Sequence, residues 1–111
     1  MSETALLLPN SAGIDAAVGI LRVGGTVAFP TETVYGLGAD ALNDAAVAKI
    51  FGAKDRPQFN PLIVHVPNLA AAEAYCVFSD SAATLASAFW PGALTLVLPL
   101  RADAGISKLV T

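Results

Sequence analysis

The sequence contains almost none of the residues that cross-link a chain or build a metal centre. Cys76 is its only cysteine and His65 its only histidine, so no disulfide can form within the chain and no Cys/His cluster can hold a metal ion. Cys76 stands among alanine and aromatic neighbours, which predicts a buried apolar side chain rather than a nucleophile. A lone cysteine also favours a reducing compartment, and we expect a cytoplasmic protein.

Charge and long apolar runs are scarce as well. Six Lys/Arg residues stand against nine Asp/Glu, a net charge of −3, which argues against broad electrostatic binding to nucleic acid or to an anionic membrane. No apolar run approaches the roughly 20 residues of a membrane-spanning helix. The N-terminus, MSETALLLPN, lacks the basic region of a signal peptide. We therefore expect a soluble protein with no membrane partner.

Common catalytic signatures are also missing. Neither G-x-x-x-x-G-K nor G-x-G-x-x-G occurs, so the sequence has no recognisable glycine-rich phosphate loop. The serine, cysteine, histidine and aspartate residues also show no convincing Ser-His-Asp or Cys-His arrangement of a nucleophilic enzyme. What remains is one apolar domain, because 111 residues of which 55% are hydrophobic can bury a single core.

The periodicity of apolar residues predicts an α/β domain. Four helices are expected at residues 14–23, 44–52, 69–75 and 79–89. Asn10 or Ser11 would cap the first helix, Gly24–Gly25 would stop it, and Asn43 would cap the second. Three apolar strands are expected at residues 26–29, 62–66 and 94–98, joined in one twisted sheet with helices packed on it. Residues 31–38 read as a polar, glycine-containing turn.

A basic loop follows the second predicted helix. Lys54, Arg56 and Asn60 lie within a few residues of one another, in a loop that Pro57 and Pro61 stiffen. A guanidinium grips phosphate or carboxylate with two parallel hydrogen bonds, whereas lysine acts as a point charge. Lys49 adds a third cation to the stretch, which suits a small anion. The alternative is an ordinary solvated loop, which Asp55 between the two cations slightly favours.

Two further polar features lie near the ends of predicted strands. Thr31-Glu32-Thr33 follows the first strand, and its hydroxyls and carboxylate can bind the ammonium and hydroxyl of an amino acid, or a metal-bound phosphate. These residues can equally well serve only to close a tight turn. His65 lies inside the second apolar strand, where a histidine is more often structural than functional.

Three strings of residues carry a resemblance to a known family. PTETVYGLGADA (residues 30–41), KIFGAKDRPQFNPLIVHV (49–66) and FWPGALTLVL (89–98) resemble the YrdC-like family of L-threonylcarbamoyladenylate synthases, in the same order and with close spacing. The resemblance covers about residues 24–100 and implies the YrdC-like fold, a twisted mixed sheet with helices packed on it. It also implies a nucleotidyltransferase that makes threonylcarbamoyl-AMP and pyrophosphate from L-threonine, bicarbonate and ATP, for threonylcarbamoyladenosine modification of tRNA.

The same resemblance assigns roles to five residues. Thr33 and His65 would contact L-threonine, Arg56 and Asn60 would contact ATP, and Lys54 with Arg56 would form the catalytic Lys-x-Arg pair. The middle position of that pair is usually glycine in the family, whereas here it is Asp55. Magnesium is expected to accompany ATP, without a metal site built by the protein. Candidate partners are tRNA-modification proteins or RNA.

The family continues beyond the three strings with a strand carrying an arginine and with a Ser-x-Asn motif, neither of which this sequence contains. Residues 1–111 are therefore expected to form a partial YrdC-like domain, with an exposed sheet edge that predicts self-association, for example as a homodimer. The alternatives are a double-stranded RNA-binding module, a non-catalytic fragment that packs against a partner, and the YrdC-like module of the multidomain carbamoyl-transfer proteins that mature hydrogenases.

Overall fold

Four helices and one two-stranded sheet make up the described part of the chain in the computed structural model, which covers residues 4–54 and 62–110. Helix α1 (Ser11–Arg22) begins earlier than the predicted residue 14, at the predicted cap, because the Asn10 side chain accepts a hydrogen bond from the Gly13 amide at 2.9 Å. It ends before Gly24, whose φ of 87° is a conformation that glycine adopts cheaply. The expected α1 cap and stop are both confirmed.

Strand β1 (Val27–Phe29) pairs antiparallel with strand β2 (Gly36–Gly38), and Phe29 lies opposite Gly36. The sequence predicted a turn over residues 31–38, so β2 was missed. Glycine is uncommon in strands, but here the Phe29 ring lies close to Gly38 and leaves no room for a side chain at that position. A Cβ atom added at Gly38 would come within 2.8 Å of that ring.

Helix α2 (Asp44–Lys54) carries the largest buried side chains of the described chain. Asn43 caps it by accepting a hydrogen bond from the Ala46 amide at 3.0 Å. The predicted buried stripe is confirmed, since Val47, Ile50 and Phe51 are 1%, 6% and 3% exposed. Val47 and Phe51 form a core cluster with Val110, so α2 anchors the far end of the chain.

The second half of the molecule contains two helices whose buried residues are small. Helix α3 (Leu69–Glu73) buries Ala72, and helix α4 (Asp80–Phe89) buries Ala82 and Ala86. Both helices begin at a side-chain cap, Asn68 for α3 and Ser79 for α4. All four predicted helices are therefore present, although α3 is shorter than expected.

Two of the three predicted strands are not strands in the structure. Residues 62–66 and 94–98 are extended, but within the described chain the only strands are β1 and β2, which form a two-stranded antiparallel sheet rather than the expected larger one. Pairing in the second half occurs just beyond the predicted strand, where Cys76 forms an isolated antiparallel bridge with Leu100. An apolar run predicts only that a segment is buried. A strand also needs a paired strand about 4.8 Å away, and here a cleft separates residues 62–66 from residues 94–98.

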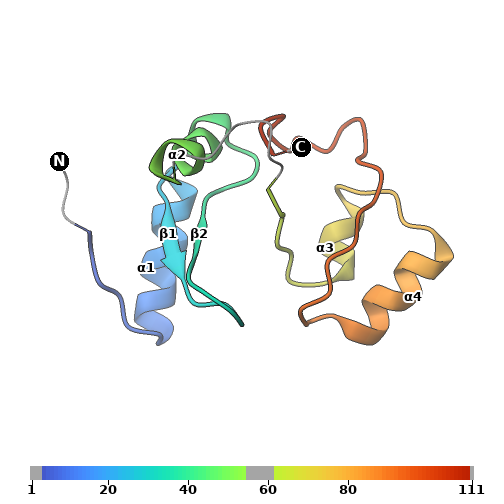
Figure 1. Cartoon of the computed structure of the whole chain (residues 1–111), viewed down its shortest axis with the longest axis horizontal. Helices are drawn as coiled ribbons and strands as arrows, with labels where there is room; N and C mark the ends of the chain where they lie inside the picture. Colours follow the sequence, from blue (N-terminus) through green and yellow to red (C-terminus); the bar gives the residue numbers. More distant parts are fainter. Residues whose placement is uncertain (1–3, 55–61, 111) are drawn as a thin grey trace.

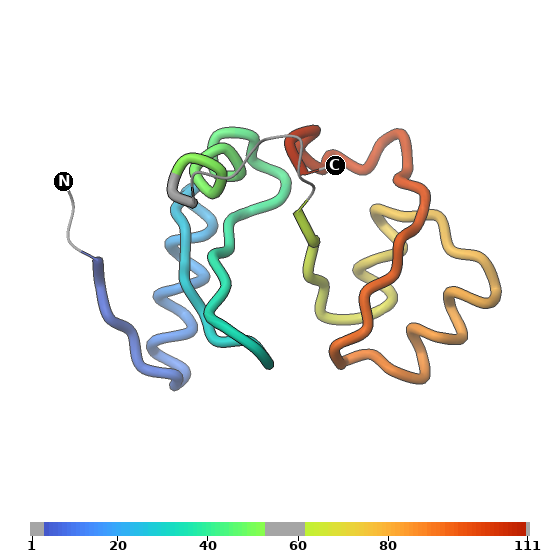
Figure 2. Tube along the Cα trace, viewed as in Figure 1, coloured from blue at the N-terminus to red at the C-terminus, as the bar shows by residue number. Residues whose placement is uncertain are grey.

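The chain forms two halves that meet along one side of the molecule (Figure 1). One half contains α1, β1, β2 and α2, and the other contains α3, α4 and the C-terminal residues. The last described residues return to α2 (Figure 2), where the Ser107 amide donates to the Ala41 carbonyl at 2.8 Å and the Leu62 amide donates to the Val110 carbonyl at 2.9 Å. The radius of gyration is 14.9 Å, above the roughly 13 Å expected for a compact chain of this length, so the arrangement is open.

Candidate functional site

A cleft of about 780 Å³ lies between the two extended segments 62–66 and 90–98. Its walls are mostly apolar and include Trp90, Phe78 and Ala72 of α3. A second hollow, of about 860 Å³, lies on the other side of residues 62–66, against β1, β2 and α2. Both are large enough for a small-molecule ligand, because such sites commonly measure about 300–1,000 Å³. The segment 62–66 is therefore a shared wall with ligand-sized space on each side.

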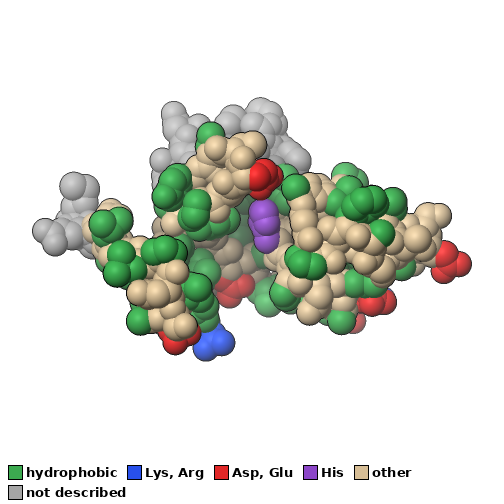
Figure 3. Space-filling model, turned by 90° about the horizontal axis from the view of Figure 1, so that it is seen from below, with side chains coloured by type: hydrophobic (Ala, Val, Ile, Leu, Met, Phe, Trp, Pro, Cys, Tyr) green, Lys and Arg blue, Asp and Glu red, His purple; other side chains and the backbone are tan. Residues whose placement is uncertain are grey.

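His65 lies on this shared wall and lines both hollows. Figure 3 shows the histidine, in purple, standing in the hollow between the two halves. Its ring meets the Phe29 ring edge-on, with 6.2 Å between the ring centroids and an interplanar angle of 86°. Such edge-to-face contacts are favourable and orient a ring. The contact orients the imidazole at the cleft, and no hydrogen bond joins its nitrogens to another of the described residues.

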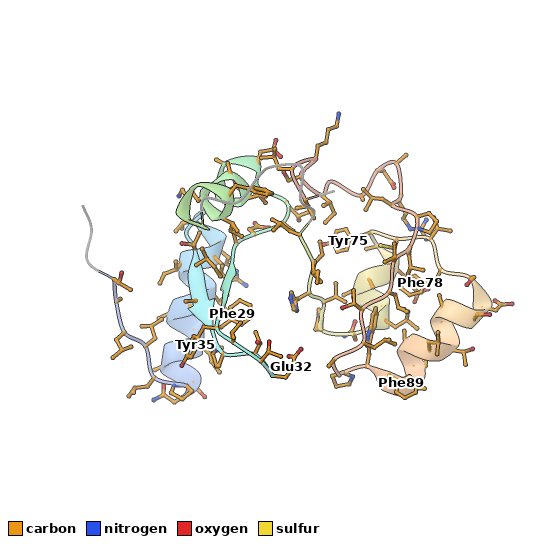
Figure 4. The ribbon with its side chains drawn as sticks, in the orientation of Figure 1. Phe29, Glu32, Tyr35, Tyr75, Phe78 and Phe89 are labelled. Carbon is orange, nitrogen blue, oxygen red and sulfur yellow. The ribbon has the colours of Figure 1, made fainter. Side chains whose placement is uncertain are left out.

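The turn after β1 brings a carboxylate to the same cleft. The Thr31 hydroxyl donates to the Val34 carbonyl and accepts from the Thr33 amide at 3.3 Å. Thr31 therefore closes the turn, as the structural interpretation of these residues predicted. Glu32 lies at the tip of the turn, facing the space between the halves (Figure 4), and it lines the cleft together with His65.

The structure describes only two of the five predicted site residues in full. His65 lines the cleft, whereas Thr33 is exposed in the neighbouring turn, with its hydroxyl 3.5 Å from that of Thr31, and lines neither hollow. Lys54 is the last residue of α2. Arg56 and Asn60 lie outside the described residues. The predicted meeting of Thr33 and His65 around one ligand therefore stays a prediction, as do the roles of Lys54, Arg56 and Asn60.

Lys49 has a structural role that the sequence did not indicate. Its ammonium donates to the Gly24 carbonyl at 2.8 Å, which ties α2 to the end of α1. Of the three cations in the basic stretch, Lys49 therefore makes a structural hydrogen bond. Among residues 4–54 and 62–110, no group of three or more His, Cys, Asp or Glu side chains could hold a metal ion, and no helix has the length and apolarity needed to cross a membrane.

Sequence reasoning also missed the polar contacts that shape the cleft wall. The Trp90 indole Nε1 donates to the Leu94 carbonyl at 2.9 Å, and the Trp90 ring meets the Phe78 ring edge-on at 6.3 Å between centroids. Thr95 adds a hydroxyl to the same wall. The string FWPGALTLVL includes Trp90 and Thr95 but assigned them no role, because their role depends on segments that are brought together only by folding. The resulting cleft combines an apolar wall with one carboxylate, one imidazole and a few hydroxyls, which suits a small amphipathic ligand such as an amino acid.

Comparison with known proteins identifies similar chains. A model of the family Sua5/YciO/YrdC, described as telomere recombination, matches residues 19–111. The threonylcarbamoyl-AMP synthase of Bacillus subtilis is 52% identical over 106 residues, which is 95% of this chain and 30% of that protein. The threonylcarbamoyl-AMP synthase of Pyrococcus abyssi is 54% identical over 87 residues, which is 78% of this chain and 26% of that protein. The chain thus spans less than a third of the length of these two relatives.

A solved structure shows the same fold. The structure of a double-alanine variant of Pyrococcus abyssi Sua5 aligns with a TM-score of 0.85 and 46% sequence identity, over 91% of this chain and 31% of that one. The α/β fold class that the residues and the resemblance predicted is therefore confirmed.

Proposed function

Because the chain belongs to the Sua5/YciO/YrdC family, we propose that it provides part of an enzyme that makes threonylcarbamoyl-AMP from L-threonine, bicarbonate and ATP. The observation that carries this proposal is the identity of 52–54% to relatives named threonylcarbamoyl-AMP synthase. The cleft supports it, because an imidazole and a carboxylate beside an apolar wall suit a small amino acid. The product would feed threonylcarbamoyladenosine formation in tRNA, in the cytoplasm. RNA-binding as the main activity is less well supported, since the net charge is −3.

The proposed reaction has two bond-forming steps. Threonine and bicarbonate first combine to a carbamate with loss of water. A carbamate oxygen then attacks the α-phosphorus of ATP, the bond from that phosphorus to the bridging oxygen breaks, and pyrophosphate leaves. Most of the rate in such a transfer comes from alignment of the reactants and from charge placed around the phosphates.

The five predicted residues would divide these tasks. We assign the threonine side to Thr33 and His65, and the nucleotide to Arg56 and Asn60. The cations of Lys54 and Arg56 would balance the charge that develops on the phosphates as pyrophosphate leaves. Magnesium would arrive with ATP, bound to its phosphate oxygens.

We also propose that residues 1–111 form only part of the catalytic domain. The accessible surface is 8098 Å², whereas a compact protein of this mass exposes about 5,700 Å². Large apolar side chains stay uncovered, among them Val97 at 97% and Ile63 at 64% exposure, and both line the cleft. Covering this surface would close the cleft and exclude water from the reaction.

Arg56 offers a direct test of nucleotide binding. Arg56→Ala should weaken ATP binding about tenfold or more, because a charge-assisted contact is worth about 1.5–3 kcal/mol. Titration calorimetry on a protein long enough to bind ATP measures the affinity, and Lys108→Ala, which removes an exposed cation away from the cleft, serves as the control. Equal affinity of Arg56→Ala and the unaltered protein would assign Arg56 to an ordinary solvated loop.

A chimera tests whether the domain is partial. The 111-residue chain alone should release little pyrophosphate in the presence of ATP, bicarbonate and L-threonine, and should self-associate. Joined to the remaining residues of the Bacillus subtilis relative, it should turn over and become monodisperse. Rapid threonine-dependent pyrophosphate release by a monomeric 111-residue chain would contradict the proposal of a partial domain, and no release by the chimera would contradict the proposed enzyme.

A further inference from the structure

Glu32 is the only acidic side chain among the described residues that line the 780 Å³ cleft. It comes from the turn after β1, whereas most of the cleft wall comes from residues 62–66 and 90–98. Figure 4 shows it at the tip of that turn, facing the other half of the molecule. A single carboxylate in a mostly apolar cleft marks the place where a cationic group of a ligand would be bound.

The turn holds Glu32 in place and leaves its carboxylate accessible. Thr31 supplies the hydrogen bonds that close the turn, to the Val34 carbonyl and from the Thr33 amide. Glu32 itself is exposed, and no hydrogen bond joins its carboxylate to any other described residue. The carboxylate is therefore not needed to build the turn and can interact with a ligand.

We propose that Glu32 binds the ammonium group of the amino acid substrate and accepts the proton that this group loses. The inference rests on the proposed function, because it concerns the threonine of that reaction. An ammonium and a carboxylate form a charge-assisted hydrogen bond, which is stronger beside an apolar wall than in bulk water. His65, which lines the same cleft, would then contact the hydroxyl end of the ligand.

Carbamate formation releases a proton, which a carboxylate beside the amine can accept. Threonine with a protonated amine and bicarbonate give the carbamate, one water molecule and one proton. The ammonium has no lone pair, so it must lose a proton before nitrogen can bond to the bicarbonate carbon. A carboxylate within hydrogen-bond reach of the amine takes that proton as a general base, and solvent regenerates the carboxylate.

Two ligands that differ only in the amine test the binding role. Calorimetric titration of the chimera should show that Glu32→Gln weakens L-threonine about tenfold or more while the affinity for 3-hydroxybutanoate, which lacks the amine, is unchanged. Glu73→Gln is the matched control, since it makes the same change on an exposed residue outside the cleft, and should alter neither affinity. Equal weakening of both ligands by Glu32→Gln, or of neither, would overturn the inference. Failure of the unaltered chimera to bind threonine would instead overturn the proposed function.

The pH dependence of turnover tests the proton role. Without the carboxylate, the reaction must draw on the small fraction of threonine whose amine is already neutral, and that fraction grows with pH. The pyrophosphate release rate of Glu32→Gln should therefore rise with pH more steeply than that of the unaltered chimera, and Glu73→Gln should follow the unaltered profile. Parallel profiles for Glu32→Gln and the unaltered chimera would refute proton acceptance by Glu32. A steeper rise with pH that is confined to His65→Gln would assign the base to His65 and overturn the inference.

Discussion

Helices α2 and α4 contain similar amounts of apolar residue but bury them differently. Helix α2 buries Val47, Ile50 and Phe51. Helix α4 buries only Ala82 and Ala86, and leaves Leu85 at 43% and Phe89 at 59% exposure. The half of the molecule around α2 therefore has a core of large side chains, whereas the half around α4 is held by small ones.

This difference matters for the site. In the second half, the large apolar residues of segments 62–66 and 90–98 line the cleft instead of filling a core. Side chains that line a cleft stabilise the fold less than side chains in a core, because their apolar area stays in contact with water. We infer that the first half carries most of the stability of the chain and that the second half supplies most of the cleft.

The largest expected effect lies in the core of the first half. Phe51→Ala should lower the free energy of unfolding by about 3–5 kcal/mol, the usual range for a buried phenylalanine. Phe89→Ala removes the same ring from α4, where it is 59% exposed, and should change stability by about 0.5 kcal/mol or less. Urea denaturation measures both. If the two variants lost equal stability, the comparison between the two halves would be wrong.

A smaller effect is expected where the two halves meet. Val110 is 3% exposed and packs with Val47 and Phe51. Val110→Ala should lower the free energy of unfolding by about 1.5 kcal/mol, the lower end for burying a valine. It should also speed hydrogen exchange at the Leu62 amide, which is bonded to the Val110 carbonyl. Val97→Ala is the control, because Val97 is 97% exposed; unchanged exchange at Leu62 in Val110→Ala would argue against a contact that joins the halves.

The smallest effect concerns the start of α4. Ser79 accepts a hydrogen bond from the Ala82 amide at 3.1 Å, so Ser79→Ala should lower the free energy of unfolding by about 1 kcal/mol. Ser81→Ala, within the first turn of the helix, keeps the cap and should be neutral or slightly stabilising. Thermal unfolding followed by circular dichroism compares the two. A Ser81→Ala variant that loses as much stability as Ser79→Ala would show that the cap contributes nothing specific.

The helices could be predicted because their signals are local. A cap such as Asn10 acts on an amide three residues away, and Gly24 stops α1 through its own backbone conformation. The buried stripe of α2 follows from the spacing of Val47, Ile50 and Phe51 alone. The prediction of an α/β domain needed only these helices and the apolar strands between them.

The strands and the cleft could not be predicted with the same success. Residues 62–66 and 94–98 have the composition of strands, yet strand pairing depends on a partner that is distant in sequence. Strand β2 was missed for the opposite reason, since glycine is uncommon in strands and Gly38 is accounted for only by the Phe29 ring that lies against it. His65 was found as a candidate by resemblance, but its contact with Phe29 and its place beside both hollows required the structure.

The sequence by itself determined that four helices form, their approximate bounds and which residues of α2 are buried, because these properties depend on neighbours within about one helical turn. It also indicated, by resemblance, the family that the comparisons then confirmed. Only the tertiary structure decided that Lys49 bonds to the Gly24 carbonyl and that Glu32 lines the same cleft as His65. These contacts join atoms whose separation in space is set by the packing of whole elements, and no local pattern of residues encodes that separation.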